Sequence, residues 1–169
     1  MTMIVHMFIA AGIFFGDLAI KNQIDRSRTD AGGYVLGRGT DEKAPEPRTY
    51  ARGRILIRKY RNRGAMLNLG QKYPGAVAAV SVVFTLLTAA GFLLGLGQRG
   101  NRLFRTGMTF LLGGAFSNTY DRLKRRYVVY YLTFRVGWKP LGRVVFNISD
   151  FAIMIGAMLA VLGVFFDEV

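Results

Sequence analysis

Four long apolar segments alternate with polar stretches along the chain, at residues 3–20, 74–96, 103–120 and 144–166. Each approaches the ~20 residues that a helix needs to cross the hydrocarbon core of a bilayer. The pattern therefore predicts four membrane-spanning helices. Asp17 interrupts the end of the first segment and no small-residue cleavage pattern follows it, so we expect this segment to be retained rather than removed as a secretory signal.

Two polar stretches, residues 22–73 and 122–143, contain strand-like patterns. Residues 55–57, Ile-Leu-Ile, are typical of a short strand, and residues 127–136 are rich in Val, Tyr, Phe and Thr. A period of two gives the second strand one apolar face, formed by Val128, Tyr130, Leu132, Phe134 and Val136. Because an even number of crossings separates the two stretches, both should lie on the same side of the membrane.

The predicted fold is a mainly α membrane protein with four transmembrane helices and a small extramembrane β-sheet cap. It forms a single membrane domain over residues 1–169, with cap segments at 22–73 and 122–143. Hydrophobic residues make up 51% of the chain and the formal net charge is +13. This combination is typical of a small polytopic membrane protein with basic loops.

The composition excludes several kinds of catalysis. Cysteine is absent, and the single histidine, His6, cannot build a metal cluster, so we expect no metal and no cofactor. We interpret His6 as a polar residue near a helix start. Hydrolysis would then have to come from carboxylates or from a Ser/Lys pair, in which Lys21 would be joined by Ser117 or Ser149.

The basic residues are unevenly distributed. Thirteen Lys and Arg fall between Lys21 and Lys72, seven between Arg122 and Arg143, and three in or beside the short second loop. The positive-inside rule would place the two basic stretches in the cytoplasm. Alternatively, these stretches lie outside and use their charge to hold anionic lipid headgroups or substrate. They contain no recognition motif for nucleic acid, which we therefore exclude as a partner.

Two stretches place a carboxylate beside an asparagine at the rim of an apolar segment: residues 113–122, Gly-Gly-Ala-Phe-Ser-Asn-Thr-Tyr-Asp-Arg, and 146–150, Phe-Asn-Ile-Ser-Asp. A charged side chain at membrane depth costs at least roughly 2.5 to 3.5 kcal/mol, so it needs a partner, a water-filled cleft or a reaction to serve. Asp121 and Asp150 are therefore candidate functional residues.

Together with two further motifs, these stretches resemble the lipoprotein signal peptidase (signal peptidase II) family of bacterial membrane aspartic proteases. Asp17 and Lys21 match its Asp-x-x-x-Lys element, and residues 62–65 match its Asn-x-Gly-Ala element. Residues 113–122 match its Gly-Gly-Ala-x-x-Asn-x-x-Asp-Arg element, and residues 146–150 match its Phe-Asn-x-Ala-Asp element. The four elements occur in the family's order across four apolar segments.

The resemblance implies a pair of aspartates that share one proton and activate water. Asp150 matches the second member of this pair, but Tyr130 stands where the family's Val-Val-Asp-Phe element has the first. A phenol with a pKa near 10 is a poor general base at neutral pH. Asp121 is the only other carboxylate between the third helix and Asp150, so it is the candidate replacement. Ser149 also departs from the family's alanine, and Lys124-Arg125-Arg126 adds three cations before Tyr130.

The remaining motif residues are predicted by the resemblance to orient the site or contact substrate: Asn62, Gly64, Asn118, Arg122, Asn147, Asp17 and Lys21. Structural roles are the alternative. The asparagines can hydrogen-bond between helices, Asp17 and Lys21 can form an ordinary i to i+4 pair, and Asp121 can pair with Arg122. Gly113 and Gly114 can either let helices approach closely or admit substrate. Tyr130 is either an aromatic on the apolar strand face or a hydrogen-bond donor to Asp150.

Two functions follow from the resemblance. The first is an active peptidase that cuts diacylglyceryl-modified prolipoproteins just before the lipidated cysteine. The second is a catalytically silent paralogue that binds a lipoprotein, signal peptide or lipid without cutting it. In either case the resemblance implies a monomer in the bacterial cytoplasmic membrane, among membrane lipids, with both termini cytoplasmic and the site facing the extracytoplasmic side.

Overall fold

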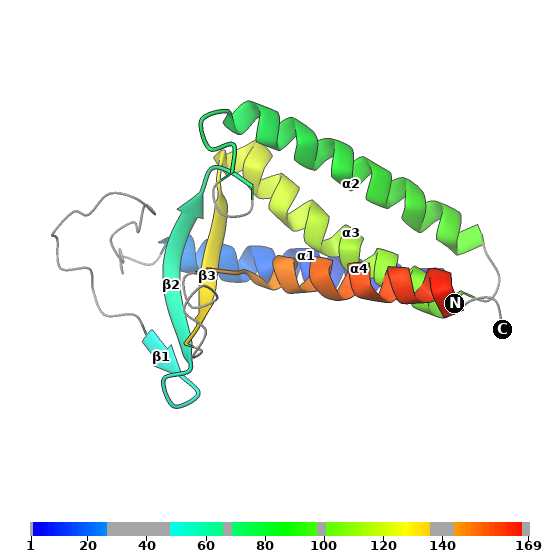
Figure 1. Ribbon diagram of the computed structural model, residues 1–169, viewed down its shortest axis with the longest axis horizontal. Coiled ribbons are helices and arrows are strands. Elements are labelled where there is room, and N and C mark those ends of the chain that lie inside the picture. The colour runs from blue at the N-terminus through cyan, green and yellow to red at the C-terminus, as the bar shows by residue number, and fades with distance from the viewer. Residues whose placement is uncertain (1, 27–47, 66–68, 98–100, 136–143, 167–169) are drawn as a thin grey trace, which may run out of the picture.

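A bundle of four helices carries a small sheet across one end. The computed structural model describes residues 2–26, 48–65, 69–97, 101–135 and 144–166. The helices are α1 (Thr2–Arg26), α2 (Pro74–Gly97), α3 (Arg102–Arg125) and α4 (Ile148–Phe166), and the strands are β1 (Arg48–Tyr50), β2 (Ile55–Asn62) and β3 (Val128–Phe134). The start of α1 and the end of α4 lie at the end of the bundle opposite the sheet (Figure 1). The predicted fold class, a mainly helical membrane protein with a β-sheet cap, is confirmed.

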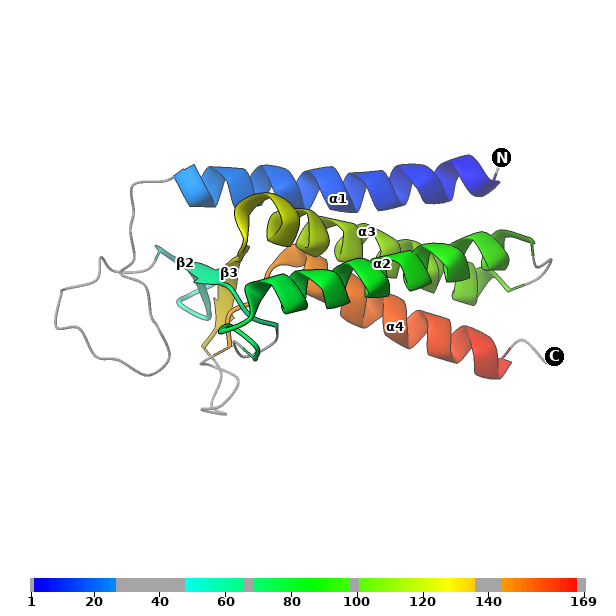
Figure 2. The same cartoon turned by 90° about the horizontal axis from the view of Figure 1, so that it is seen from above.

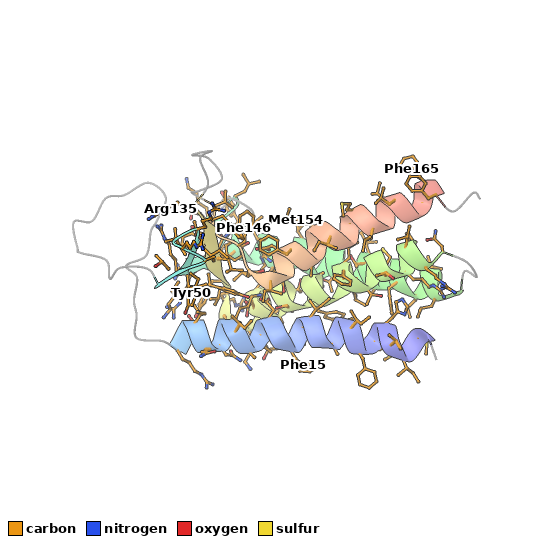
Figure 3. All side chains as sticks on the ribbon, turned by 90° about the horizontal axis from the view of Figure 1, so that it is seen from below. Phe15, Tyr50, Arg135, Phe146, Met154 and Phe165 are labelled. Atoms are coloured by element: carbon orange, nitrogen blue, oxygen red, sulfur yellow. The ribbon has the colours of Figure 1, made fainter. Side chains whose placement is uncertain are left out.

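Three of the helices are long and apolar enough to cross a membrane, at Met3–Arg26, Pro74–Leu96 and Ile148–Phe166. Their outward side chains are apolar, as Figure 3 shows for Phe15, Met154 and Phe165, which are 64%, 58% and 75% exposed. The remaining helix, α3, is more polar. It packs against α1, α2 and α4 (Figure 2), so most of its side chains are buried or partly buried, although Leu103, Phe116 and Leu123 are exposed. This central position is the reason that α3 need not be uniformly apolar.

Glycines allow α3 to approach its neighbours closely. A Cβ atom added at Gly107 would lie 2.3 Å from the backbone nitrogen of Ala160, and one at Gly114 would lie 2.6 Å from the carbonyl oxygen of Ser149, both in α4. A Cβ atom at Gly113 would lie 2.9 Å from the carbonyl oxygen of Ala10 in α1. Small residues are the usual means of close helix packing in membranes. Gly113 thus faces α1 and Gly114 faces α4, and the neighbouring helix occupies the space beside each glycine.

The sheet is antiparallel in the order β1-β2-β3. The sequence predicted β3 and the first part of β2, but β1 and the rest of β2 were missed. The prediction of one apolar face on β3 needs correction, because Val129, Tyr131 and Thr133 on the opposite face are also buried. Val136 lies outside the described residues. The ends of α1 and α3 pack against β3, which accounts for the burial of this second face.

A cluster of polar contacts ties the end of α1 to the sheet. The Asp25 carboxylate lies 2.7 Å from Arg61 Nη2 and accepts a hydrogen bond from the Tyr127 hydroxyl at 2.9 Å. The Lys59 Nζ atom donates to the Asp25 carbonyl oxygen at 2.7 Å. α1 therefore extends past the apolar layer and ends against the cap.

Replacing Gly107 with alanine should destabilise the protein, because the added methyl group meets the α4 backbone rather than a movable side chain. We expect a loss of about 1–3 kcal/mol in the free energy of unfolding, seen as a lower thermal midpoint in detergent. Gly12→Ala is the matched control, since a Cβ atom at Gly12 has nothing within 4 Å. An equal effect of the two substitutions would contradict the packing assigned to Gly107.

Candidate functional site

The ammonium group of Lys21 is fully buried where α1 meets α3. Its Nζ atom lies 2.7 Å from Asp17 Oδ2 and 3.2 Å from Asp121 Oδ2, and all three side chains are 0% exposed. It also donates hydrogen bonds to Ser117 Oγ at 3.0 Å and to Asn118 Oδ1 at 2.9 Å. We call these five residues the Lys21 cluster. The two carboxylates and two oxygen acceptors replace the water that a buried ammonium ion loses.

The Asp17 carboxylate joins four elements of the fold. Its Oδ2 atom accepts hydrogen bonds from Ser117 Oγ at 2.7 Å and from the Ser149 hydroxyl, and its Oδ1 atom accepts one from the Tyr131 hydroxyl at 2.9 Å. The Tyr131 oxygen in turn accepts a hydrogen bond from the Ile148 backbone nitrogen at 3.2 Å. Burial and the nearby Asp17 charge raise the pKa of Tyr131 well above its ordinary value, so its phenol remains a donor. Through Asp17, α1 is bound to α3, β3 and the start of α4.

Asp121 is also held inside the protein. One carboxylate oxygen contacts Lys21, and the other lies 3.4 Å from Arg125 Nε. The backbone nitrogen of Val129 lies 3.5 Å from Asp121 Oδ2. The expected local pair with Arg122 is not formed, because Arg125, one turn further along α3, takes that position instead.

Asp150 forms a capping box with Asn147 at the start of α4. The Asn147 backbone nitrogen donates to Asp150 Oδ2 at 2.9 Å, and the Asp150 backbone nitrogen donates to Asn147 Oδ1 at 2.9 Å. This reciprocal arrangement satisfies two backbone donors that helix formation leaves free. The second carboxylate oxygen of Asp150 accepts a hydrogen bond from Asn118 Nδ2 at 3.1 Å. These hydrogen bonds fix the orientation of the Asp150 carboxylate. The residue is half-buried, so it can still be reached from the surface.

Tyr130 lies on β3 with its hydroxyl group near Asp150, Arg122 and Asn62. The residue is 9% exposed, and its ring packs 6.3 Å from that of Tyr60. Burial, followed by the Asp150 charge, raises the pKa of Tyr130 to about 12, although Arg122 and Asn62 act in the opposite direction. At neutral pH the phenol is therefore un-ionised. It can donate a hydrogen bond, but it cannot take up a proton as a carboxylate does.

The Asn62 side chain shapes the loop beside Tyr130. Its Oδ1 atom accepts from the Gly64 backbone nitrogen at 2.7 Å, and its Nδ2 atom donates to the Ala65 carbonyl oxygen at 2.8 Å. The Arg122 guanidinium reaches the Gly64 carbonyl oxygen at 3.3 Å and the Asn118 carbonyl oxygen at 3.4 Å. The Asn-x-Gly-Ala element thus forms a turn that Arg122 connects to α3.

The candidate acids Asp121 and Asp150 do not meet. Contacts run from Asp121 through Lys21 and Asn118 to Asp150, and no hydrogen bond joins the two carboxyl groups in the described part of the chain. Two acids that share a proton must be in direct contact. This geometry argues against Asp121 as a replacement for the missing aspartate.

A Ser/Lys pair does form, between Lys21 and Ser117, but its surroundings are unsuited to catalysis. The Lys21 Nζ atom is enclosed by the carboxylates of Asp17 and Asp121 and by Asn118 as well as by Ser117, so it is not free to activate the serine. The Ser117 hydroxyl is fully buried and donates to Asp17. The burial of Asp17 and Lys21 also leaves neither residue accessible for the direct substrate contact that the motif suggested.

Among the residues that the structure describes, no group of three or more His, Asp or Glu is placed to hold a metal ion.

A family model described as signal peptidase (SPase) II matches residues 9–166. The chain belongs to the signal peptidase II family. Its apolar helices agree with this assignment to a family of bacterial membrane enzymes. The four sequence motifs that suggested the resemblance all fall within the matched residues.

Several relatives are lipoprotein signal peptidases. The enzyme from Histophilus somni is 36% identical over 95 residues, which are 56% of this chain and 54% of that protein. The one from Halothermothrix orenii is 34% identical over 109 residues, 63% of this chain and 68% of that protein. The one from Listeria monocytogenes is 28% identical over 116 residues, 69% of this chain and 73% of that protein. The first of these alignments spans only about half the length of the relative.

Two solved structures, each described as a bacterial membrane enzyme, share the fold. One has a TM-score of 0.70 at 18% identity and covers 95% of this chain and 87% of the other. The second has a TM-score of 0.67 at 18% identity and covers 97% of this chain and 94% of the other. At this level of identity the similarity establishes the arrangement of the helices and the cap alone.

Two hydroxyl groups shape the site of this signal peptidase II family member in a way that sequence reasoning missed, although it noted the change at Ser149. Tyr131 stands where the family element has phenylalanine, and Ser149 stands where it has alanine. Both changes add a hydroxyl group, and both hydroxyl groups donate to Asp17. The sequence feature that could have revealed them is that two family motifs each carry a hydroxyl-bearing residue, Tyr131 or Ser149, in place of an apolar one. The departures from the family pattern therefore strengthen the Lys21 cluster as well as removing an acid.

Replacing Lys21 with methionine should strongly destabilise the protein, because it leaves Asp17 and Asp121 buried without their cation. We expect a loss of about 3–5 kcal/mol in the free energy of unfolding, measured by thermal or denaturant unfolding in detergent. Lys72→Met removes the same charge from an exposed position and serves as the control. Adding Asp121→Asn to Lys21→Met should recover part of the loss. A double variant as unstable as the single one would contradict the ion-pair explanation.

Proposed function

We propose that the protein binds diacylglyceryl-modified prolipoproteins, or their signal peptides, at the surface around Asp150, and does not cleave them by a two-aspartate mechanism. The supporting observation is Tyr130, a buried un-ionised phenol beside Asp150, where the family motif has an aspartate. The proposal makes the protein a non-cleaving member of its family.

Water activation by two acids requires one group that accepts a proton while the other donates one. Tyr130 cannot accept a proton in the neutral range, because it already carries one up to a pKa of about 12. Asp150 would have to act alone, and Asn118 and Asn147 each donate a hydrogen bond to one of its oxygen atoms. Asp121 is engaged by Lys21 and Arg125. These arrangements support binding without cleavage.

Recognition of a peptide needs fewer groups than its hydrolysis. The half-buried Asp150 carboxylate can accept a hydrogen bond from a peptide N–H, and the Tyr130 hydroxyl can donate one to a peptide carbonyl. Arg122 supplies a guanidinium group, which binds carboxylate or phosphate oxygens with two parallel donors. Asn118 and Asn147 hold Asp150, the Asn118 carbonyl oxygen accepts from Arg122, and Asn62 shapes the loop beside Tyr130. A monomer contains all of them.

An active peptidase is the second candidate, because the family assignment and the retained Asp150 favour it. In that case a group outside the Asp121–Asp150 pair would have to supply the missing acid.

The decisive experiment offers a synthetic diacylglyceryl lipopeptide to the purified protein and measures binding and cleavage together. We expect binding without cleavage, with an affinity that changes less than about twofold between pH 6 and 9 because Tyr130 does not ionise there. Asp150→Asn should weaken binding about tenfold by removing the charged acceptor. Tyr130→Asp should permit slow cleavage by restoring a carboxylate next to Asp150.

Cleavage by the unmodified protein that is abolished by Asp150→Asn would establish the peptidase and overturn the proposal. Cleavage that persists in Asp150→Asn would identify a contaminating peptidase. If the lipopeptide neither binds nor is cleaved, while thermal unfolding shows a folded protein, both candidate functions fail.

We further propose that the cap and Asp150 face the extracytoplasmic side of the cytoplasmic membrane. The cysteine-free chain allows a direct test with single cysteines at exposed positions on opposite ends of the bundle, Lys72→Cys at the cap and Arg102→Cys at the far end. A membrane-impermeant thiol reagent should label the first in intact cells and the second only after lysis. The reverse pattern would refute this orientation.

A further inference from the structure

The hairpin formed by β1 and β2 extends beyond the helix bundle. Figure 1 shows its turn past the helices, on the side of the bundle away from α2. β2 and β3 run across the direction of the helices, so the sheet lies roughly parallel to the surface of a bilayer that the helices span. The outer end of the hairpin therefore lies over the lipid beside the bundle.

This outer end carries a cluster of exposed arginines. Arg52 lies in the turn, Arg54 ends it, and Arg135 follows the last residue of β3. The Arg135 backbone nitrogen donates to the Arg54 carbonyl oxygen at 2.7 Å, so these two residues are direct neighbours. In the described part of the chain, none of the three arginines forms an ion pair with a carboxylate. We call Arg52, Arg54 and Arg135 the hairpin arginines.

Aromatic side chains accompany the hairpin arginines. Tyr50 is 53% exposed at the end of β1, and Figure 3 shows it with Arg135 at the cap end of the molecule. Behind the hairpin, the rings of Phe134, Phe146 and Phe151 pack with centroids 5.4–6.2 Å apart. Exposed tyrosines are common at the headgroup level of membranes, where one end of the ring is apolar and the other is wet. The phenylalanine cluster fixes the end of β3 to the start of α4.

The turn itself is held in one conformation. Tyr50 pairs with Ile55 across the hairpin, and Ala51, Arg52 and Gly53 have φ angles of 51°, 58° and 81°. The Gly53 backbone nitrogen donates to the Tyr50 carbonyl oxygen at 3.1 Å. The arginines are thus presented from a defined turn over the membrane plane.

We propose that the hairpin arginines bind the phosphate headgroups of anionic phospholipids in the leaflet on the cap side. Their position over lipid favours a headgroup, since the sheet holds them at the membrane surface. Guanidinium groups bind phosphate oxygens in bidentate fashion, and basic residues near a membrane surface attract anionic lipid. This interaction is separate from the surface around Asp150 and does not depend on the proposed function.

The test compares lipid retention by native mass spectrometry of the full-length protein in detergent, with phosphatidylglycerol and phosphatidylcholine offered at equal concentration. The unmodified protein should prefer phosphatidylglycerol. In the triple variant R52Q/R54Q/R135Q, the ratio of retained phosphatidylglycerol to phosphatidylcholine should fall at least about fivefold, because each cation near a charged surface contributes about 1 kcal/mol. The control R63Q/K72Q/K124Q removes the same charge from exposed positions at the α2 and α3 side of the cap, and should change the preference less than about twofold.

Equal losses in both triple variants would overturn the proposal, because they would indicate a diffuse effect of net charge. An unchanged preference in the hairpin variant would also overturn it. The charge-preserving variant R52K/R54K/R135K should retain most of the preference, and its complete loss would argue against an ionic headgroup site. Should the triple glutamine variant fail to fold, the single variants R52Q, R54Q and R135Q, each compared with K72Q, provide the same test, and a loss no larger than that of K72Q would overturn the proposal.

Discussion

The buried ammonium group of Lys21 is the constraint on which the rest of the structure depends. An ion without water must be surrounded by opposite charge and hydrogen-bond acceptors, and the chain supplies these from different elements. Asp17 comes from α1, while Asp121, Ser117 and Asn118 come from α3. Through Asp17 the same cluster reaches β3 and the start of α4. Few apolar side chains of α1 are buried inside the protein. The position of α1 is therefore determined by this polar contact, together with the glycine packing and the Asp25 contacts.

The same cluster explains what the site has kept and lost. Lys21 orients Asn118, and Asn118 orients Asp150, so the second acid of the family's pair is held by groups that do not take part in proton transfer. Tyr130 stands at the position of the first acid, and its pKa of about 12 means that at neutral pH its hydroxyl group keeps its proton. The hydroxyl groups of Tyr131 and Ser149 add hydrogen bonds to Asp17. The scaffold around Asp150 is therefore held by many hydrogen bonds, whereas the residue beside it is a phenol in place of a carboxylate.

The sequence predicted the features that repeat along the chain and missed those that depend on distant partners. Apolar length identified the helices, and strand-forming residues identified β2 and β3. The second buried face of β3 was missed because alternation describes a strand covered on one side, and Val129 and Tyr131 are covered by α1 and α3 instead. The motifs brought Asp17, Lys21, Asn118 and Asp150 into the candidate site, but their roles required the structure. Lys21 and Asn118 are 97 residues apart in sequence, and no local spacing can indicate that their side chains meet.

The charge of the cap bears directly on its orientation. Moving a positive charge out of the cell against a membrane potential is unfavourable by about 2.3 kcal/mol for each 100 mV, which is the physical content of the positive-inside rule. Some cations of the cap have partners within the protein, such as Arg61 with Asp25 and Arg125 with Asp121. The hairpin arginines instead are exposed on the part of the sheet that extends beyond the bundle, where anionic headgroups would contribute about 1 kcal/mol for each cation. An extracytoplasmic cap with this charge therefore depends on anionic lipid in the same leaflet, and a site for such lipid is what the exposed hairpin provides.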